Sequence, residues 1–441
     1  MKYLFFGSIL FLTAIGGIAY GVGIGVYRMW PYTELRFIKD ELSFVLSDLM
    51  GRTDRLVLTD DSRSLPDLAP VEPAGLFGAS VPRVSFPGPI SGYTLVLGTF
   101  DLGTVEHAAL LFDETGRVVH HWVLNEDAIA TAERRDTPYK FPHGFEVMPD
   151  GSVIFAFDGG VSLQKFDACS RPVWAVEGAY HHSVTLTGDR RHVWTLINHD
   201  PVPEDPRDEA RRAGAHKIGV ADGSIDASFT VRDVIRANPT LDLFGARQMD
   251  ETKHGYSWIR DPMHPNDIDP LPAALAGAFP DFAPGDLLMS FRGLNLVTAV
   301  DPETQKVKWY SYGQMRRQHD PDWEPDGTIT IYDNRMHRNS SRIIQLRPPE
   351  PQHSETIIKG EDVEFYSWIQ GKHQLTDGGN AVLFSIPQQG RVLEIDRDGN
   401  VRMELVNNFQ RSNNRRFLVS EAKRLPVNYF HPGTFELCTK Q

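Results

Sequence analysis

Beyond about residue 90, the apolar positions of the chain fall in short runs of β-branched and aromatic residues, which Asp-Gly and similar turns separate. The period of a long amphipathic helix does not occur in this part of the sequence. Short apolar runs between turns are typical of β-strands that follow one another through tight connections. We therefore predict an all-β domain over residues 90–441.

The predicted strands recur in a repeated unit. HGFEVMPDGSVIFAFD, which begins at His143, aligns with HDPDWEPDGTITIYDN, which begins at His319. His182 and His264 open two further stretches of this kind, and more strands follow each of them. Units begin near residues 92, 143, 182, 264, 319 and 370. Six units of four strands predict a six-bladed β-propeller.

A ring of blades has to join its two ends, because it would otherwise expose an unpaired edge strand. The first unit, from about residue 92 to 124, lacks an inner strand. We expect the C-terminal segment Ser420–Phe430 (SEAKRLPVNYF) to supply this strand and to close the ring.

The N-terminal residues 3–27 carry no charged side chain and are mostly apolar. This run is longer than the roughly 20 residues that a helix needs to cross a bilayer, and longer than the apolar core of about 7 to 15 residues in a cleaved signal peptide. We predict a transmembrane anchor over residues 1–30, with a cleaved signal peptide as the alternative. Lys2 precedes the run and Arg28 follows it. The charges therefore do not settle which side of the membrane the domain occupies.

The segment after the anchor predicts a short juxtamembrane helix over residues 31–50. Its apolar positions alternate in steps of three and four residues: Leu35, Ile38, Leu42, Val45 and Leu49. This seam could pair with a second chain in a homodimer, or it could pack on the chain's own domain or on the lipid surface. Residues 51–89 are rich in Asp, Ser and Pro, which predicts a linker.

Composition narrows the class of protein. With 58 acidic and 45 basic residues, the chain has a net charge of -13. It therefore lacks the surplus of basic residues that is typical of nucleic-acid-binding proteins. The 41% of hydrophobic residues suffices for a large core. Cys169 and Cys438 show neither CxxC nor zinc-site spacing. An extracytoplasmic setting would permit a disulfide between them, but a sequence carries no distance, and we assign the pair no role.

Four of the 16 histidines share one place in the repeat, the start of a unit's first strand. They are His143, His182, His264 and His319. The first strands of a propeller line its central channel, so these side chains are expected to meet on the rim of that channel. The fifth matching position holds Gln370, and His373 lies three residues later, on the other face of its strand. The shared position favours a functional site over four unrelated structural histidines.

The second strand of each unit runs antiparallel to the first and therefore ends at the same rim. Arg292 ends this strand in the His264 unit, near Asn266, and Asn334 ends it in the His319 unit. A permanently charged guanidinium among imidazoles predicts a pocket for a tetrahedral oxyanion. We expect no metal site, because no carboxylate shares the repeated position and a metal ion would face the cationic arginine.

Five segments carry most of these residues: MHPNDID (263–269), LLMSFRGLNLVTAVD (287–301), WYSYG (309–313), QHDPDWEPDGTITIYDN (318–334) and SRIIQL (341–346). In these motifs the chain resembles the bacterial arylsulfotransferases, which are PAPS-independent sulfotransferases of the periplasm. Together with weaker matches, the resemblance covers nearly all of the chain beyond about residue 90. It implies the fold predicted above, a six-bladed propeller.

The resemblance also implies roles for individual residues. His319, in the QHD motif, would accept the sulfuryl group as a covalent sulfohistidine. His264 and Arg292 would be further catalytic residues. An earlier rim histidine of the family corresponds to His182 or, as an alternative, to His181. We expect three residues to contact the substrate: His143, Asn266 and Asn334.

The activity that the resemblance implies is transfer of a sulfuryl group from a phenolic sulfate ester to a phenol, with ping-pong kinetics and without metal, nucleotide or other cofactor. It also implies a periplasmic propeller, which the predicted single span would attach to the inner membrane. Two alternatives remain open. One is a metal-dependent propeller hydrolase or lyase, and the other is a non-enzymatic, membrane-anchored propeller that binds a ligand or a protein.

Overall fold

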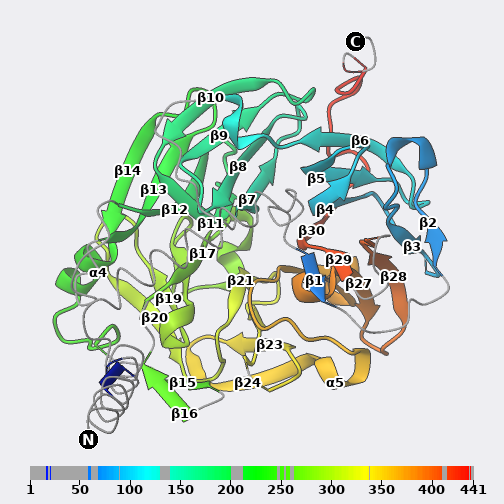
Figure 1. Ribbon diagram of the computed structural model, residues 1–441. Helices are drawn as coiled ribbons and strands as arrows, with labels where there is room; N and C mark the ends of the chain where they lie inside the picture. Colours follow the sequence, from blue (N-terminus) through cyan, green and yellow to red (C-terminus); the bar gives the residue numbers. More distant parts are fainter. Residues whose placement is uncertain are drawn as a thin grey trace, which may run out of the picture. The chain divides into compact units, whose positions relative to one another are not determined.

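Six antiparallel sheets stand in a ring around a common centre, like the blades of a propeller (Figure 1). This confirms the predicted all-β fold of six blades with four-stranded sheets. The computed structural model describes residues 16–17, 20, 58–60, 68–88, 90–129, 140–199, 212–245, 249–252, 255–258, 263–336, 338–409, 415–436 and 438. Residues 56–441 form one compact unit.

Each blade is named here from its inner strand outward. Blade 1 consists of β30 (Val419–Leu425), β4 (Tyr93–Asp101), β5 (Val105–Phe112) and β6 (Val118–Val123). Blade 2 consists of β7 (Phe141–Val147), β8 (Val153–Asp158), β9 (Ser162–Phe166) and β10 (Pro172–Glu177). Blade 3 consists of β11 (Ala179–Leu186), β12 (His192–Asn198), β13 (Ala213–Gly219) and β14 (Ile225–Thr230).

The second half of the ring follows the same order. Blade 4 consists of β17 (Pro265–Pro270), β18 (Leu287–Phe291), β19 (Leu296–Val300) and β20 (Val307–Tyr312). Blade 5 consists of β21 (His319–Trp323), β22 (Ile329–Asp333), β23 (Arg342–Arg347) and β24 (Glu350–Lys359). Blade 6 begins with β25 (His373–Thr376), β26 (Ala381–Ile386), β27 (Arg391–Asp396) and β28 (Val401–Val406).

Short elements fill the connections. The helices are α4 (Val231–Ala237) and α5 (Gly360–Val363). The 3-10 turns are η2 (Ala74–Leu76), η3 (Glu126–Ala128), η5 (Ala273–Ala278), η6 (Arg292–Leu294), η7 (Asp377–Gly379) and η8 (Pro387–Gln389). Two small ribbons pair β15 (Met249–Thr252) with β16 (Gly255–Trp258) and β1 (Leu58–Asp60) with β29 (Arg415–Phe417).

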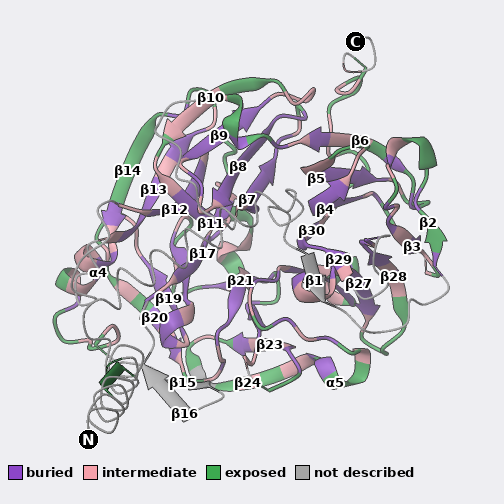
Figure 2. Cartoon of the chain, in the orientation of Figure 1, coloured by how far each residue is buried: buried purple, intermediate pink, exposed green. Residues whose placement is uncertain are grey.

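Apolar layers between neighbouring sheets hold the blades together. Leu97, Trp122, Phe145 and Phe155 form part of one such buried layer between blades 1 and 2. Each large apolar side chain contributes about 1.5–3 kcal/mol when it is fully buried. The inner strand β7 is buried along its whole length, whereas the outer strand β14 is largely exposed (Figure 2). The rim position of His143 is therefore built on a fully buried strand.

The C-terminal strand closes the ring, as predicted. β30 pairs with β4 from Val419 opposite Gly98 to Leu425 opposite Tyr93, and so becomes the inner strand of blade 1. The strand ends at Leu425, earlier than the predicted Phe430. Farther along, a disulfide joins Cys438 to Cys169 at the turn between β9 and β10, with a Cα–Cα distance of 5.1 Å. The sequence analysis assigned this pair no role, but the disulfide attaches the C-terminal tail to blade 2.

Part of the proline-rich segment 51–89, predicted as a linker, belongs to the propeller. β3 (Arg83–Ser85) pairs with β28, and β2 (Ala69–Pro70) pairs with β3, so the sheet of blade 6 has six strands. Val71 and Val84 are buried in the core. Prolines are compatible with this position because an edge strand does not need every N–H group for pairing.

The predicted anchor over 1–30 and the predicted helix over 31–50 lie outside the described residues, except for residues 16, 17 and 20. Within the part of the chain that the structure describes, no helix has the length and apolar character needed to cross a bilayer. The anchor, the juxtamembrane helix and the homodimer therefore stay predictions.

Candidate active site

The inner strands of four blades break register at the rim where the predicted histidines lie. Pairing with the second strand is interrupted between Pro142 and Phe145, His181 and Val184, Pro265 and Asp267, and His319 and Pro321. Bulges of this kind bend a strand and redirect its side chains. His182 and His264 have φ angles of 65° and 43°, a conformation that costs about 1–3 kcal/mol in a non-glycine residue and that clusters at functional sites.

The four predicted histidines converge. The ring centroids of His143 and His182 are 4.2 Å apart, and those of His182 and His264 are 5.1 Å apart. The imidazole of His319 interacts electrostatically with this row. His143, His182 and His319 are only 5%, 6% and 3% exposed. Their shared place in the repeat thus corresponds to one buried cluster at the centre of the ring.

Arg292 lies beside this cluster, at the end of the second strand of blade 4. It directly follows β18, and its Nη1 donates a hydrogen bond to Nε2 of His264 over 2.9 Å. Because a guanidinium can only donate, Nε2 of His264 is the acceptor nitrogen of a neutral ring. A permanent cation therefore stands next to imidazoles, an arrangement suited to an oxyanion.

Asn266 links blade 4 to the segment that leads into His319. Its Nδ2 donates to the backbone carbonyl of Gln318 over 2.8 Å. Its Oδ1 is buried and has no hydrogen-bond partner among the residues that the structure describes. The amide thus positions the start of β21 and leaves one buried acceptor, the atom available for the substrate contact predicted for this residue.

His319 is held in one tautomer by Asn334. The Nδ1 atom of His319 lies 2.7 Å from Oδ1 of Asn334. The Nδ2 group of Asn334 donates to the carbonyls of Ser367 and Gln370, so its Oδ1 faces the imidazole as an acceptor. His319 therefore donates from Nδ1 and keeps a lone pair on Nε2. Oδ1 of Asn334 orients His319 and its Nδ2 is bound by two carbonyls, and the substrate contact predicted for Asn334 stays a prediction.

Three imidazoles of the cluster, those of His143, His182 and His319, have lowered pKa values. Burial is the main cause that lowers the pKa of His319 well below its usual value, and the charge of Arg292 lowers it further. Burial also lowers the pKa of His143 and of His182, and neighbouring imidazoles add to this effect. Neutral rings carry a free lone pair at neutral pH, which both a nucleophile and a metal ligand require.

The two adjacent histidines His181 and His182, which were alternatives for one catalytic position, have different surroundings. The ring of His182 contacts that of His143 in a tilted arrangement and that of His264 edge to face, within the cluster. His181 lies behind it, with the two Nδ1 atoms 2.7 Å apart. One of these nitrogens must donate and the other accept. His181 is thus placed to orient His182, while His182 faces the other rim histidines.

Several residues of the site were missed by the sequence analysis. The backbone N–H of Gln370 donates to Nε2 of His319 over 3.2 Å, and Asp158 lies near His143 and His182. Lys372 joins Asp267 to Asp320 below the cluster, at Nζ–O distances of 2.5 and 2.7 Å. Asp158 could have been recognised from the repeat, because it lies at the end of the second strand of its blade, as Arg292 does. The repeat does not indicate the backbone N–H of Gln370 or the side chain of Lys372, because neither lies at a repeated position.

A cavity of about 330 Å³ lies along the inner strands. Its walls include His182, Asp267, Asp320, Lys372, Trp323 and Leu375. Of the candidate catalytic residues, His182 lines this cavity, which therefore adjoins the histidine cluster at blade 3, and ligand sites commonly lie in such cavities.

Comparison with known proteins places the chain in a family. A family model described as Arylsulfotransferase (ASST) matches residues 144–408, more than half of the 441 residues. No curated protein matches the sequence.

Solved structures share a distant overall likeness. One is a protein of unknown function from Bacteroides caccae, with 10% identity, a TM-score of 0.44, and coverage of 76% of this chain and 98% of that chain. Another is the Myceliophteria thermophila Cps50 (Swd1) β-propeller domain, with 11% identity, a TM-score of 0.41, and coverage of 73% and 88%. These likenesses are too distant to carry any argument on function. The match of the family model over the propeller, with its cluster of rim histidines, shows that the chain belongs to the arylsulfotransferase (ASST) family.

Proposed function

We propose that the protein transfers a sulfuryl group from an aryl sulfate ester to a phenol through a covalent intermediate on His319. The observation that carries this proposal is the state of that imidazole. Its Nδ1 is held by Asn334, its Nε2 keeps a lone pair, and burial keeps the ring neutral through a lowered pKa. A neutral, oriented imidazole next to a fixed cation is what nucleophilic attack on a sulfate ester requires.

In the first step, the lone pair of His319 Nε2 attacks the sulfur, and the bond between sulfur and the aryl oxygen breaks. The aryl oxygen leaves as a phenolate and takes up a proton from solvent. In the second step, the oxygen of an acceptor phenol loses its proton to solvent and attacks the sulfur, and the N–S bond breaks. In both steps the proton stays on Nδ1 of His319, where it is hydrogen-bonded to Oδ1 of Asn334, so the ring keeps its orientation.

Three groups support the sulfuryl oxygens in this proposal. Arg292 and His264, which are hydrogen-bonded to each other, face the charge that spreads over the oxygens, and His182 approaches from the next blade. The N–H of Gln370 points at Nε2 in the free protein. Once Nε2 bonds to sulfur it can no longer accept this hydrogen bond, and the N–H is released to a sulfuryl oxygen. Donors set in advance in this way stabilise developing charge at low reorganisation cost.

We also propose that the propeller lies on the periplasmic side of the inner membrane, anchored by the predicted span over residues 1–30. The Cys169–Cys438 disulfide supports an oxidising compartment, since such bonds persist outside the cytoplasm.

Trapping the intermediate tests the function directly. Full-length protein is mixed with a chromogenic aryl sulfate without acceptor, quenched at neutral or alkaline pH and digested. We expect a burst of one phenol per protein and one sulfonated peptide that contains residue 319. Addition of a phenol should discharge the modification and release the aryl sulfate of the acceptor. Turnover of the ester without a burst and without a labelled peptide would contradict the covalent step.

The pH dependence provides a second test, on Asn334. Because the pKa of His319 is depressed, the nucleophile stays neutral as pH falls below 6.5, and the burst rate should hold through that pH. Asn334→Asp places a carboxylate on Nδ1, which stabilises the imidazolium and raises the pKa of His319. The acid limb of the burst rate should therefore move to higher pH in this variant, by about one unit or more. Superimposable pH profiles of the two folded proteins would contradict the assigned role of Asn334.

A further inference from the structure

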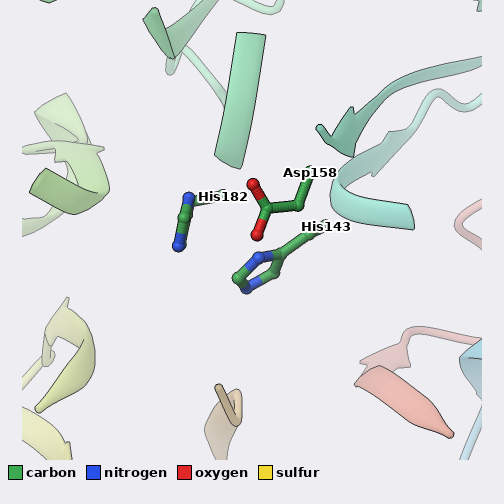
Figure 3. A group of neighbouring side chains, drawn as sticks. All are labelled: His143, Asp158 and His182. Carbon is green, nitrogen blue, oxygen red and sulfur yellow. The ribbon is translucent and has the colours of Figure 1, made fainter. Parts of the chain in front are cut away.

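A carboxylate lies between two of the rim histidines. Asp158, the last residue of β8, projects toward His143 from the same blade and toward His182 from the next blade (Figure 3). One candidate ligand atom from each side chain lies within 4.8 Å of the other two. Blades 2 and 3 thus bring two imidazoles and one carboxylate to a common point.

One of the imidazoles has an unsatisfied nitrogen. The Nδ1 of His143 is buried and has no hydrogen-bond partner among the described residues, and His143 is only 5% exposed. A buried polar atom without a partner costs about 1–3 kcal/mol, so a natural site of this kind calls for an explanation. The charges acting on this ring come from His319, Lys372, His181 and His264, which supply no hydrogen-bond acceptor or donor to Nδ1 in the described residues. A cation bound next to Nδ1 would use its lone pair.

The second imidazole already has the support that metal ligands commonly receive. The Nδ1 of His182 lies 2.7 Å from the Nδ1 of His181, which leaves Nε2 of His182 as its other nitrogen. Histidines that bind metals almost always use their second nitrogen for such an orienting hydrogen bond.

We propose that His143, Asp158 and His182 bind one divalent transition-metal ion of the Zn²⁺ type. Two imidazoles and a carboxylate are a ligand set for such ions, and three protein ligands leave one tetrahedral position open. Bonds of about 2.0–2.2 Å place tetrahedral ligand atoms about 3.3–3.6 Å apart, so ligand atoms that lie within 4.8 Å of one another have to close by at most about 1.5 Å around the ion. The open position is the place for water or an anionic oxygen.

The site revises one expectation from the sequence. No carboxylate shares the repeated position of the histidines, which was the reason to expect no metal site, but Asp158 supplies one from the end of a second strand. Arg292 was expected to oppose a metal ion, but it is hydrogen-bonded to His264, on the blade beyond His182. The metal position lies instead between blades 2 and 3. The proposal does not depend on sulfuryl transfer, since it rests only on these ligands. With an ion bound, Nε2 of His182 is a ligand, and a sulfuryl oxygen would meet the open position of the ion instead of the imidazole itself.

A second group in the channel provides an internal comparison. Asp320, Asp322 and His373 also gather within 4.8 Å. Here the Nζ of Lys372 already lies 2.7 Å from Asp320, and both the N–H and the ring of His373 bind the same carboxylate. Burial and the neighbouring Asp320 raise the pKa of Asp322, which favours its protonated form. The Nε2 of His373 is buried and has no hydrogen-bond partner among the described residues, as is the case for Nδ1 of His143, but Lys372 already supplies a cation to Asp320. We therefore expect no metal ion there.

The experiment uses Co²⁺ as a spectroscopic probe on the full-length protein after dialysis against a chelator. We expect visible absorption bands of tetrahedral or five-coordinate Co²⁺ that saturate at one ion per chain, and displacement of these bands by Zn²⁺. Asp158→Asn and His143→Gln should each weaken Co²⁺ binding by at least about 10-fold, since even the loss of an outer-shell partner costs 10–100-fold. Asp322→Asn, which keeps the shape of a protonated carboxyl, is the matched control and should bind Co²⁺ as the wild type does.

Three results would overturn the proposal. They are the absence of saturable binding at one ion per chain, unchanged binding in folded Asp158→Asn and His143→Gln proteins, and loss of binding in Asp322→Asn. Circular dichroism of each variant establishes that it is folded. Sulfonation of residue 319 is measured separately by mass spectrometry, with and without chelator, so failure of the metal site and failure of the covalent step are distinguishable.

Discussion

His319→Gln and His319→Ala should lose the burst of phenol and should turn over aryl sulfates at least about 10³-fold more slowly than the wild type. Both variants lack the only nitrogen that we assign as nucleophile. The glutamine retains most of the buried volume, so it separates the loss of chemistry from the effect of a cavity, which the alanine variant creates. Initial rates with a chromogenic ester at saturating phenol, together with thermal unfolding of each variant, measure the two effects.

A matched histidine on the same propeller serves as the control for this prediction. His192 begins β12, at the end of that strand remote from His182, and its ring pairs with Asp226 near the surface. Exposed ion pairs contribute only about 0–1 kcal/mol, so His192→Gln should remain folded and react at the wild-type rate. If His319→Gln matched His192→Gln in rate, the nucleophile would have to be another residue.

Removal of the last strand should prevent the propeller from folding. A chain that ends at Leu418 lacks β30, and blade 1 then exposes the whole inner edge of β4. It also loses the buried apolar contacts of Val419, Ala422 and Leu425, and the ion pairs of Lys423 with Glu146 and of Arg424 with Glu394. Removal of one partner of a buried pair alone costs about 3–5 kcal/mol, against a total stability of about 5–15 kcal/mol. We expect no cooperative unfolding transition, measured by guanidinium titration of the soluble fraction.

The control for truncation keeps the strand and removes only the covalent link. Cys169→Ala combined with Cys438→Ala should lower the free energy of unfolding by about 2–4 kcal/mol while retaining a cooperative transition. A truncated chain that unfolds cooperatively, with the stability of this double variant, would show that β30 is dispensable for closure.

The sequence predicted those features that repeat. Each blade contributes the same strand pattern, so the number of blades, the inner position of His143, His182, His264 and His319, and the missing strand of blade 1 could all be read from one chain. Residues at the same position of each repeat lie at equivalent places around the central channel, because every blade is related to the next by a similar rotation.

Features that occur once were not predictable in this way. β2 and β3 lie among prolines, and only the pairing of β3 with β28 shows that they extend a sheet. The role of Asn334 depends on which way its amide points, which is decided by the carbonyls of Ser367 and Gln370. The disulfide depends on a distance between residues that are 269 positions apart. No local pattern of residue types encodes any of these three.

The joining of the two ends of the propeller has a consequence for its synthesis. β3, near the start of the domain, completes the outside of blade 6, while β30, at its end, completes the inside of blade 1. Neither blade can be finished until nearly the whole chain has emerged, and contacts of such long sequence separation form slowly. Blade 1 therefore waits with an open edge during translation, the state in which β-domains are most prone to pair with other chains. We therefore expect efficient production of this protein to depend on protection of that edge until the last strand is synthesised.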